Sequence, residues 1–288
     1  MRAALSAAAA AILLVPCALL AAEPDPCAGP PGAAAIVPPL GRVAARIEEG
    51  GPLTIVAVGS SSTSGIGATG PAFTYPSRLE AELRARFPKL DIHVINRGKG
   101  GEDAPEELAR LSSDVLALHP DLAIWQVGTN AVLRRDDLAA DGEWMREGVD
   151  LLTRNGIDVV LMDLQYAPRV LERGAYPAME SLVAEIADRA RVGLFRRFAL
   201  MRYWQRSHSP EAPTMVGADG LHMTDAGYGC LAADLAGALE ANWRAEVKLA
   251  HRERRISSAV AGLPRAPVNS STLDSHGIMR RNDAVPFN

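Results

Sequence analysis

The sequence is poor in several features that would assign it to a class of protein directly. Its 288 residues include only three cysteines, 5% aromatic residues and no excess of positive charge, the formal net charge being −4. This charge argues against a nucleic-acid partner, which would select a basic face. Neither Cys27 nor Cys230 has a cysteine or histidine nearby at metal-ligand spacing, so we expect no metal site. The Gly-x-Ser-x-Gly elbow of α/β hydrolases and the His-Glu-x-x-His motif of zinc proteases are also missing.

The N-terminus has the features of an export signal. Arg2 precedes an uncharged apolar run over residues 3–20, and a small-residue cleavage site ends at Ala22. A membrane anchor is one alternative, because the run approaches spanning length. A lipid anchor on Cys17 is another, although Pro16 stands where a small residue is expected. We expect removal of residues 1–22, a periplasmic or secreted protein, and no stable membrane span afterwards.

The same cleavage would leave two cysteines in the mature chain. Cys27 and Cys230 can form one disulfide in an oxidising compartment, or remain two free thiols. The sequence leaves both alternatives open.

Short apolar runs alternate with amphipathic segments through the middle of the chain. This alternation predicts βαβ units, and hence an α/β fold with a five-stranded parallel sheet in a three-layer α/β/α sandwich. The expected strands cover residues 53–58, 91–96, 122–127, 157–164 and 192–195, and the expected helices residues 75–87, 102–118, 136–155, 177–190 and 224–247.

Composition changes at both ends of this pattern. Residues 23–50 are rich in proline and glycine and are expected to form a linker, so the predicted domain spans residues 51–247. Residues 248–288 lose the periodicity and are expected to form a loosely ordered tail, and removal of residues 251–288 is expected to leave activity largely intact.

Polar and glycine-rich blocks follow three of the expected strands, and a fourth block precedes the last helix. They are Gly-Ser-Ser-Ser-Thr-Ser-Gly at 59–65, Asn-Arg-Gly-Lys-Gly-Gly-Glu at 96–102, Gly-Thr-Asn at 128–130 and Asp-Gly-Leu-His at 219–222. Because parallel strands present their carboxyl ends at one edge of a sheet, we expect these blocks to converge there.

The four blocks resemble those of the SGNH hydrolases, the GDSL-type serine esterases. That family carries Gly-Asp-Ser, Asn-x-Gly-x-x-Gly, Gly-x-Asn and Asp-x-x-His in this order, and the resemblance covers residues 53–245. It implies the flavodoxin-like SGNH fold and an ester hydrolase that needs no cofactor. One position departs from the pattern, since Ser60 stands where the family has aspartate. We expect Ser60→Asp to be tolerated by the fold.

The resemblance implies a role for five residues. Ser61 would be the nucleophile, His222 its general base and Asp219 the group that orients the imidazole. The oxyanion hole would consist of the Ser61 N–H, the Gly101 N–H and the Asn130 side-chain amide. These residue types suit acyl transfer, because a serine hydroxyl needs a base and the developing oxyanion needs preset donors.

Each block also has a structural interpretation. Ser61 and Asn130 can cap helices, Gly101 can serve a tight turn, and Asp219 with His222 can form a surface turn. The remaining histidines lack a comparable context and are interpreted as structural or solvated; they are His93, His119, His208, His251 and His276.

A second glycine motif points elsewhere. Gly65, Gly67 and Gly70 match the Gly-x-Gly-x-x-Gly pattern of dinucleotide sites. That site needs a helix to start within the motif, and Pro71 and Pro76 argue against one. We therefore do not expect a dinucleotide cofactor.

The sequence thus favours an exported serine esterase whose substrate is an acylated glycan, a lipid or a small ester. Deacetylation of cell-wall or extracellular polysaccharide is one prediction for its reaction. Lysophospholipid or small-ester hydrolysis, acyl transfer to a sugar, and glycan binding without turnover are the alternatives. Five aromatic residues are candidates for lining a sugar or acyl site, although core packing is their commoner fate: Trp125, Tyr166, Tyr176, Tyr203 and Trp204.

Overall fold

The computed structural model describes residues 27, 29, 35–135, 137–207, 212 and 214–261. The chain divides into two compact units, Met1–Lys248 and Leu249–Asn288. The first unit contains the whole sheet. The predicted signal peptide, His208, His276 and residues 262–288 of the predicted tail lie outside the described residues.

Five parallel strands form one sheet in the order β2-β1-β3-β4-β5. The strands are β1 (Leu53–Gly59), β2 (Ile92–Gly98), β3 (Leu122–Gln126), β4 (Asp158–Met162) and β5 (Gly193–Phe195). The apolar runs of β1, β3 and β4 suit strands that are covered on both faces, whereas the edge strand β2 is mostly half-buried. The order reverses at β1, since β2 pairs with one edge of β1 and β3 with the other. A parallel sheet of this kind binds ligands beyond the carboxyl ends of the strands at such a reversal.

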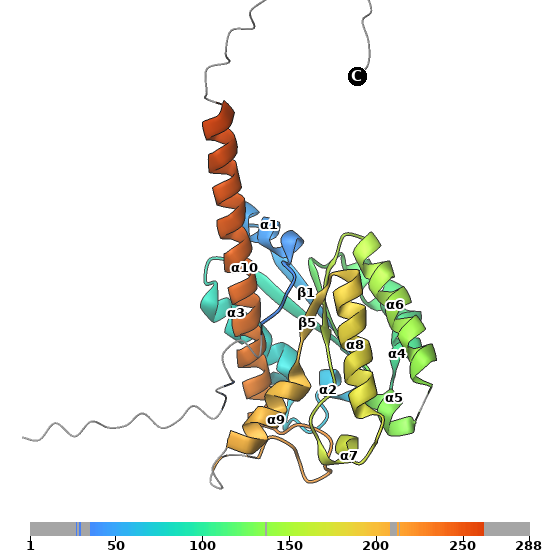
Figure 1. Ribbon diagram of the computed structural model, residues 1–288. Helices are drawn as coiled ribbons and strands as arrows, with labels where there is room; N and C mark the ends of the chain where they lie inside the picture. The colour runs from blue at the N-terminus through green and yellow to red at the C-terminus, as the bar shows by residue number, and fades with distance from the viewer. Residues whose placement is uncertain are drawn as a thin grey trace, which may run out of the picture. The chain divides into compact units, whose positions relative to one another are not determined.

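Helices cover both faces of the sheet, which confirms the three-layer α/β/α prediction. Ile55 and Ala57 face one core with α1 (Gly41–Glu49), α3 (Tyr75–Arg86) and the first turns of α10 (Asp225–Ala261). Val56 and Val58 face the other core with α4 (Ala104–Asp114), α6 (Leu138–Arg154) and α8 (Tyr176–Ala190). Figure 1 shows these helices on opposite sides of the strands.

The helices differ from the sequence prediction in the length of the last helix and in several short segments. The helix predicted to end at residue 247 continues to Ala261 as α10. The helix predicted over residues 102–118 is divided into α4 and a short η2 (Leu116–Leu118). The alternation of strands and long helices left out five segments: α2 (Ser61–Ser64), η1 (Pro71–Phe73), α5 (Thr129–Arg134), α7 (Pro168–Leu171) and α9 (Arg197–Ser207). Except for α9, these are one or two turns long, too short to establish a helical period.

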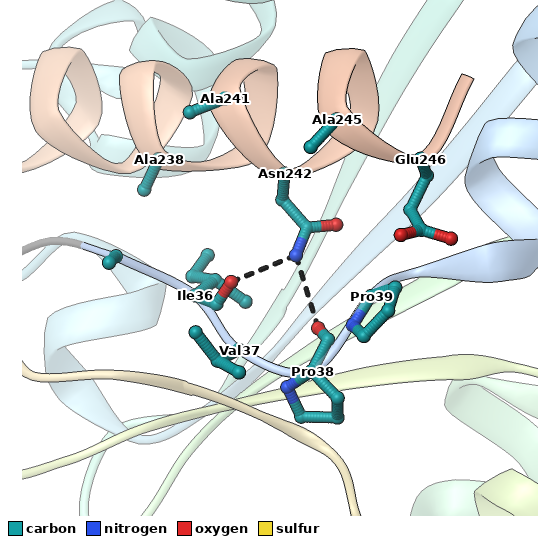
Figure 2. Close-up of a pocket in the computed structure, with 10 residues that line it drawn as sticks. Ile36, Val37, Pro38, Pro39, Ala238, Ala241, Asn242, Ala245 and Glu246 are labelled. Atoms are coloured by element: carbon teal, nitrogen blue, oxygen red, sulfur yellow. Dashed lines mark hydrogen bonds between the residues drawn. The ribbon is translucent and has the colours of Figure 1, made fainter. Parts of the chain in front are cut away.

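The predicted linker at residues 23–50 contributes to the folded unit. It includes helix α1, and Ile36, Leu40 and Val43 belong to the core. The Asn242 side chain on α10 donates to the carbonyls of Ile36 and Pro38, at 2.8 and 3.1 Å, and accepts from Leu40 N–H at 3.0 Å (Figure 2). The proline-rich composition did not indicate that this segment is folded, because these hydrogen bonds are made to a residue more than 200 positions later in the sequence.

A disulfide joins Cys27 to Cys230 and settles the alternative left open by the sequence. Trp204 Nε1–H also donates to the Cys27 carbonyl at 3.2 Å. Among the helices that the structure describes, none is both long and apolar enough to cross a membrane.

Candidate active site

The predicted nucleophile lies on a short helix at the carboxyl end of β1. Helix α2 starts at Ser61, directly after Gly59 and Ser60. The end of β2 approaches it so closely that a Cβ on Gly98 would lie 2.1 Å from the Ser64 nitrogen. The Asn96 side chain donates to the Thr63 carbonyl at 2.8 Å. Glycine at 98 and asparagine at 96 therefore hold α2 against the end of β2.

A buried arginine fastens the ends of the two strands. Arg110 on α4 donates to the carbonyl of Gly59 at 3.2 Å and to that of Arg97 at 2.8 Å. Its guanidinium also pairs with Glu102 and Asp114, and its side chain is only 8% exposed. Arg110 thus ties the carboxyl ends of β1 and β2 to helix α4.

Ser60 lies in a neutral hydrogen-bond network behind the predicted nucleophile. The Gln126 Oε1 accepts from Ser60 N–H at 3.2 Å, from Ser60 Oγ at 3.1 Å and from Thr63 Oγ1 at 3.4 Å. Thr63 Oγ1 also lies 3.4 Å from the Tyr75 hydroxyl, and burial raises the pKa of Tyr75 to about 12. The network therefore stays uncharged around neutral pH.

The predicted base and its orienting carboxylate meet in a tight turn before α10. Asp219 Oδ1 accepts from the backbone N–H groups of Leu221 and His222, both at 3.0 Å, while Oδ2 lies 2.5 Å from His222 Nδ1. Burial acts to raise the pKa of Asp219, but the hydrogen bonds from the His222 side chain and from these N–H groups outweigh it and lower the pKa. Asp219 thus stays a carboxylate and assigns the imidazole proton to Nδ1.

The free imidazole nitrogen faces the predicted nucleophile. His222 Nε2 lies 2.9 Å from Ser61 Oγ, across 161 residues of sequence. The three side chains therefore form one continuous hydrogen-bonded series, from Ser61 through His222 to Asp219. With its proton on Nδ1, His222 presents an acceptor to the serine hydroxyl.

The predicted oxyanion donors come from three segments: Ser61 starts α2, Gly101 lies in the loop after β2, and Asn130 lies in the first turn of α5. The Asn130 amide, at the start of α5, donates one hydrogen to the Glu102 carbonyl at 2.6 Å, and the Arg134 guanidinium donates to the Gly101 carbonyl. An amide nitrogen carries two hydrogens, so one hydrogen of Asn130 is not used by this bond. Gly101 is exposed and has a left-handed φ of 86°. The two contacts therefore hold the two peptide units on either side of Glu102.

A buried acid lies in α4, the helix that follows the Gly101 loop. Burial raises the pKa of Glu107 to about 8, although its carboxylate accepts from Trp125 Nε1 at 2.7 Å. Glu107 is therefore mostly protonated at neutral pH.

Among the described residues, no group of three or more histidine, cysteine, aspartate or glutamate side chains is placed to hold a metal ion.

Comparison with known proteins identifies the family. The non-GDSL lipase-like family matches residues 26–244, which is most of the chain. The chain belongs to this family. This membership confirms the resemblance to SGNH-type esterases, and the family's name agrees with the serine at position 60 in place of the aspartate of Gly-Asp-Ser.

Several relatives of this non-GDSL lipase-like protein are esterases. An acetylxylan esterase of Geobacillus stearothermophilus is 34% identical over 86 residues, 30% of this chain and 39% of the esterase. A solved acetylxylan esterase from the same organism has a TM-score of 0.55 at 22% identity, covering 66% of this chain and 95% of its own. A two-domain esterase active on acetylated mannans, co-crystallised with mannopentaose, has a TM-score of 0.60 at 21% identity, covering 74% and 56%.

These likenesses differ in what they support. The chain spans less than two thirds of the curated acetylxylan esterase and of the mannan esterase. At 21–22% identity, the structural matches concern the fold. The family and its relatives nevertheless agree with the predicted class of enzyme, a carboxylic ester hydrolase.

The predicted aromatic site is only partly accessible. Trp125 and Trp204 are fully buried in the two cores, so they cannot contact a substrate. Tyr166 and Tyr176 pack on Phe198, with ring centroids 5.2 Å away in each case, and Tyr203 is 37% exposed. The two tryptophans therefore fill the space between sheet and helices, which is the core packing given above as the commoner fate of such side chains.

A groove elsewhere on the molecule does not contain the predicted site. It encloses about 310 Å³ between residues 35–39 and one face of α10 (Figure 2). Among the described residues that line it, Glu246 is the only ionisable one, and none of those assigned to the triad or the oxyanion hole takes part.

Two buried glutamines at strand ends were missed by the sequence analysis. Gln126 is the last residue of β3 and Gln165 follows β4. Each is a polar residue at the end of an apolar run, and this was the available signal. An amide side chain can both donate and accept hydrogen bonds, so the role of each glutamine could not be inferred before its partners were known.

Proposed function

We propose that this protein is an exported serine esterase that hydrolyses carboxylic esters through an acyl-enzyme. The observation that carries the proposal is the hydrogen-bonded series from Ser61 Oγ through His222 to Asp219. In the first step, His222 Nε2 takes the proton of the Ser61 hydroxyl as its oxygen attacks the ester carbonyl. Asp219 stabilises the imidazolium that forms.

Collapse of the tetrahedral intermediate completes each half-reaction. His222 gives its proton to the departing alcohol, which leaves the acyl group on Ser61. A water molecule then attacks the acyl carbon with the same proton transfers and releases the acid. We assign oxyanion stabilisation to the N–H groups of Ser61 and Gly101 and to the Asn130 amide, and loss of one such donor costs about 10²–10³ in kcat.

The substrate that we propose is an O-acetylated polysaccharide outside the cytoplasm. Support comes from relatives described as acetylxylan esterase and as active on acetylated mannans. The predicted signal peptide at residues 1–22 and the Cys27–Cys230 disulfide support the oxidising compartment in which such polymers occur.

The test of the catalytic unit uses the mature protein and four variants. Ser61→Ala and His222→Ala should each abolish most hydrolysis of a short aryl acetate, and the double variant should be little slower than either, because the two residues act as one unit. Ser64→Ala, on the same helix, is the matched control and should keep most of the activity. A folded Ser61→Ala enzyme with native kcat would refute the proposal.

The substrate is tested separately. Acetate release should be measured with acetylated xylan, acetylated mannan, lysophospholipid and short aryl esters, with and without a sugar acceptor. Faster turnover of an acetylated glycan is the expected result. Preference for lysophospholipid, or transfer of acetate to the acceptor, would replace this substrate class while leaving the serine mechanism intact.

A further inference from the structure

One buried side chain connects the two segments that carry Ser61 and His222. Gln165 follows β4 by three residues and is only 1% exposed. Its Oε1 accepts from the Ser62 hydroxyl at 2.6 Å, and its Nε2 donates to the Leu221 carbonyl at 3.0 Å. Both functional ends of the amide are therefore occupied.

The two partners of Gln165 are next to the proposed catalytic residues in sequence. Ser62 follows Ser61 on α2, and Leu221 precedes His222 in the turn before α10. The bridge thus joins the side chain of the residue after Ser61 to the peptide unit that precedes His222. Because both hydrogen bonds are buried, water does not compete for them, and their geometry is correspondingly firm.

Other contacts between these regions attach farther from the reacting atoms. The Tyr228 hydroxyl donates to the Ile66 carbonyl at 2.7 Å, and Thr69 donates to the Asp225 carboxylate. Ile66 lies five residues after Ser61, and Asp225 three residues after His222. These contacts hold the loop at residues 65–70 against α10, whereas the Gln165 bridge holds the immediate neighbours of both reacting side chains.

We propose that Gln165 is a positioning residue that sets the distance between Ser61 Oγ and His222 Nε2. The proposal rests on the serine-esterase function proposed above. Proton transfer needs this distance to stay near the observed 2.9 Å, and a misplacement of about 1 Å can cost 10²-fold in rate. Glutamine suits the task because its amide supplies one acceptor for Ser62 and one donor for Leu221, whereas a carboxylate lacks the donor.

The decisive variant is Gln165→Leu, which keeps a similar volume and removes both hydrogen bonds. With an aryl acetate substrate, kcat should fall about 10–100-fold while KM changes less than about twofold. Asn242→Ala is the matched control, since it removes three hydrogen bonds at the groove between residues 35–39 and α10. That control should lower the melting temperature and keep the native kcat.

A double-mutant cycle separates positioning from a general loss of structure. If Gln165 acts through the Ser61–His222 pair, Gln165→Leu should cause no further loss in a His222→Ala background. An equal factor in both backgrounds would overturn the proposal, as would a folded Gln165→Leu enzyme with kcat within about twofold of native.

Two further variants cover the remaining outcomes. If Gln165→Leu does not fold, Gln165→Glu tests the same point, because it keeps the acceptor and loses the donor to Leu221; native kcat in that variant would overturn the proposal. Native activity of Ser61→Ala would instead mean that the proposed serine mechanism has failed. An inactive Ser61→Ala together with a fully active Gln165→Leu refutes only the positioning role.

Discussion

At the scale of single residues, Ser60 shows how a neutral side chain replaces the charge expected from the SGNH pattern. Its hydroxyl donates to the same Gln126 oxygen that accepts from Ser60 N–H and Thr63 Oγ1, and it is only 3% exposed. Three donors converging on one amide oxygen leave no place for a second acceptor. The sequence alone led us to expect that Ser60→Asp would be tolerated, and this burial changes the expectation.

We now predict that Ser60→Asp destabilises the protein more than Ser60→Ala. Alanine loses one hydrogen bond, worth about 1 kcal/mol, and leaves the backbone N–H of residue 60 paired with Gln126. A buried carboxylate would instead face an acceptor oxygen and cost about 1–3 kcal/mol or more. Urea unfolding of both variants measures the difference. Equal or higher stability of Ser60→Asp would show that the amide of Gln126 turns to donate.

At the scale of elements, helix α6 packs on the sheet through a glycine. A Cβ on Gly148 would lie 2.3 and 2.4 Å from two ring carbons of Trp125, which is buried on β3. Trp125 is also held by its hydrogen bond to Glu107 on α4. The Trp125 ring thus has neighbours on two helices and cannot move away from a side chain added at position 148.

Gly148→Ala is therefore expected to destabilise the protein, although alanine favours helices over glycine by about 1 kcal/mol. Overpacking against a fixed ring costs about 1–3 kcal/mol. Gly142→Ala on the same helix is the control, because its Cβ would meet only the ends of Leu182 and Arg146, at 3.1 and 3.3 Å. Thermal unfolding should show a lower melting temperature for Gly148→Ala than for Gly142→Ala, and the reverse order would refute the packing argument.

At the scale of the whole molecule, the chain is closed by a covalent link between its N-terminal segment and α10. The Cys27–Cys230 disulfide spans 203 residues of sequence and so restricts nearly the entire folded unit. Such a cross-link acts mainly on the unfolded chain, with a usual effect of about 2–4 kcal/mol.

Reduction of this disulfide should lower the free energy of unfolding by about 2–4 kcal/mol. The measurement is urea unfolding with and without a thiol reductant. The double variant Cys27→Ala and Cys230→Ala should match the reduced protein and should not respond to the reductant. A native protein that is equally stable under both conditions would contradict the expected contribution.

Buried acids give the whole molecule a second dependence on conditions. Burial raises the pKa of Glu107 to about 8 and that of Asp163 to about 7, against ordinary values of 4.5 and 3.8. At a pH between the ordinary and the raised pKa, each of these carboxyl groups stays protonated in the folded protein and ionises in the unfolded chain. Stability should therefore fall as the pH rises from about 5 to 8.

Glu107→Gln tests one of these two contributions. Glutamine can still accept the hydrogen bond from Trp125 and does not titrate. Urea unfolding between pH 5 and 9 should show a smaller loss of stability with pH for this variant than for the native protein. An unchanged slope would mean that Glu107 does not carry the effect.

The sequence by itself determined the elements whose signal is local. Short strand signals that alternate with long helices predicted all five strands and their parallel arrangement, because a connection through a helix joins parallel strands. Four short blocks at strand ends and before α10 pointed to Ser61, His222 and Asp219, which the structure brings within hydrogen-bond distance of one another. The catalytic roles themselves, and those of Gly101 and Asn130, remain predictions.

Only the tertiary structure decided which side chains hold these residues in place. Gln165 connects segments 103 residues before it and 56 residues after it, and Gln126 reaches back 66 residues to Ser60. The pairing of Cys27 with Cys230 and the burial of Trp125 were decided in the same way. A buried amide, thiol or indole takes its role from the partners that folding brings to it, and no periodicity or spacing in the chain records partners that are so far apart.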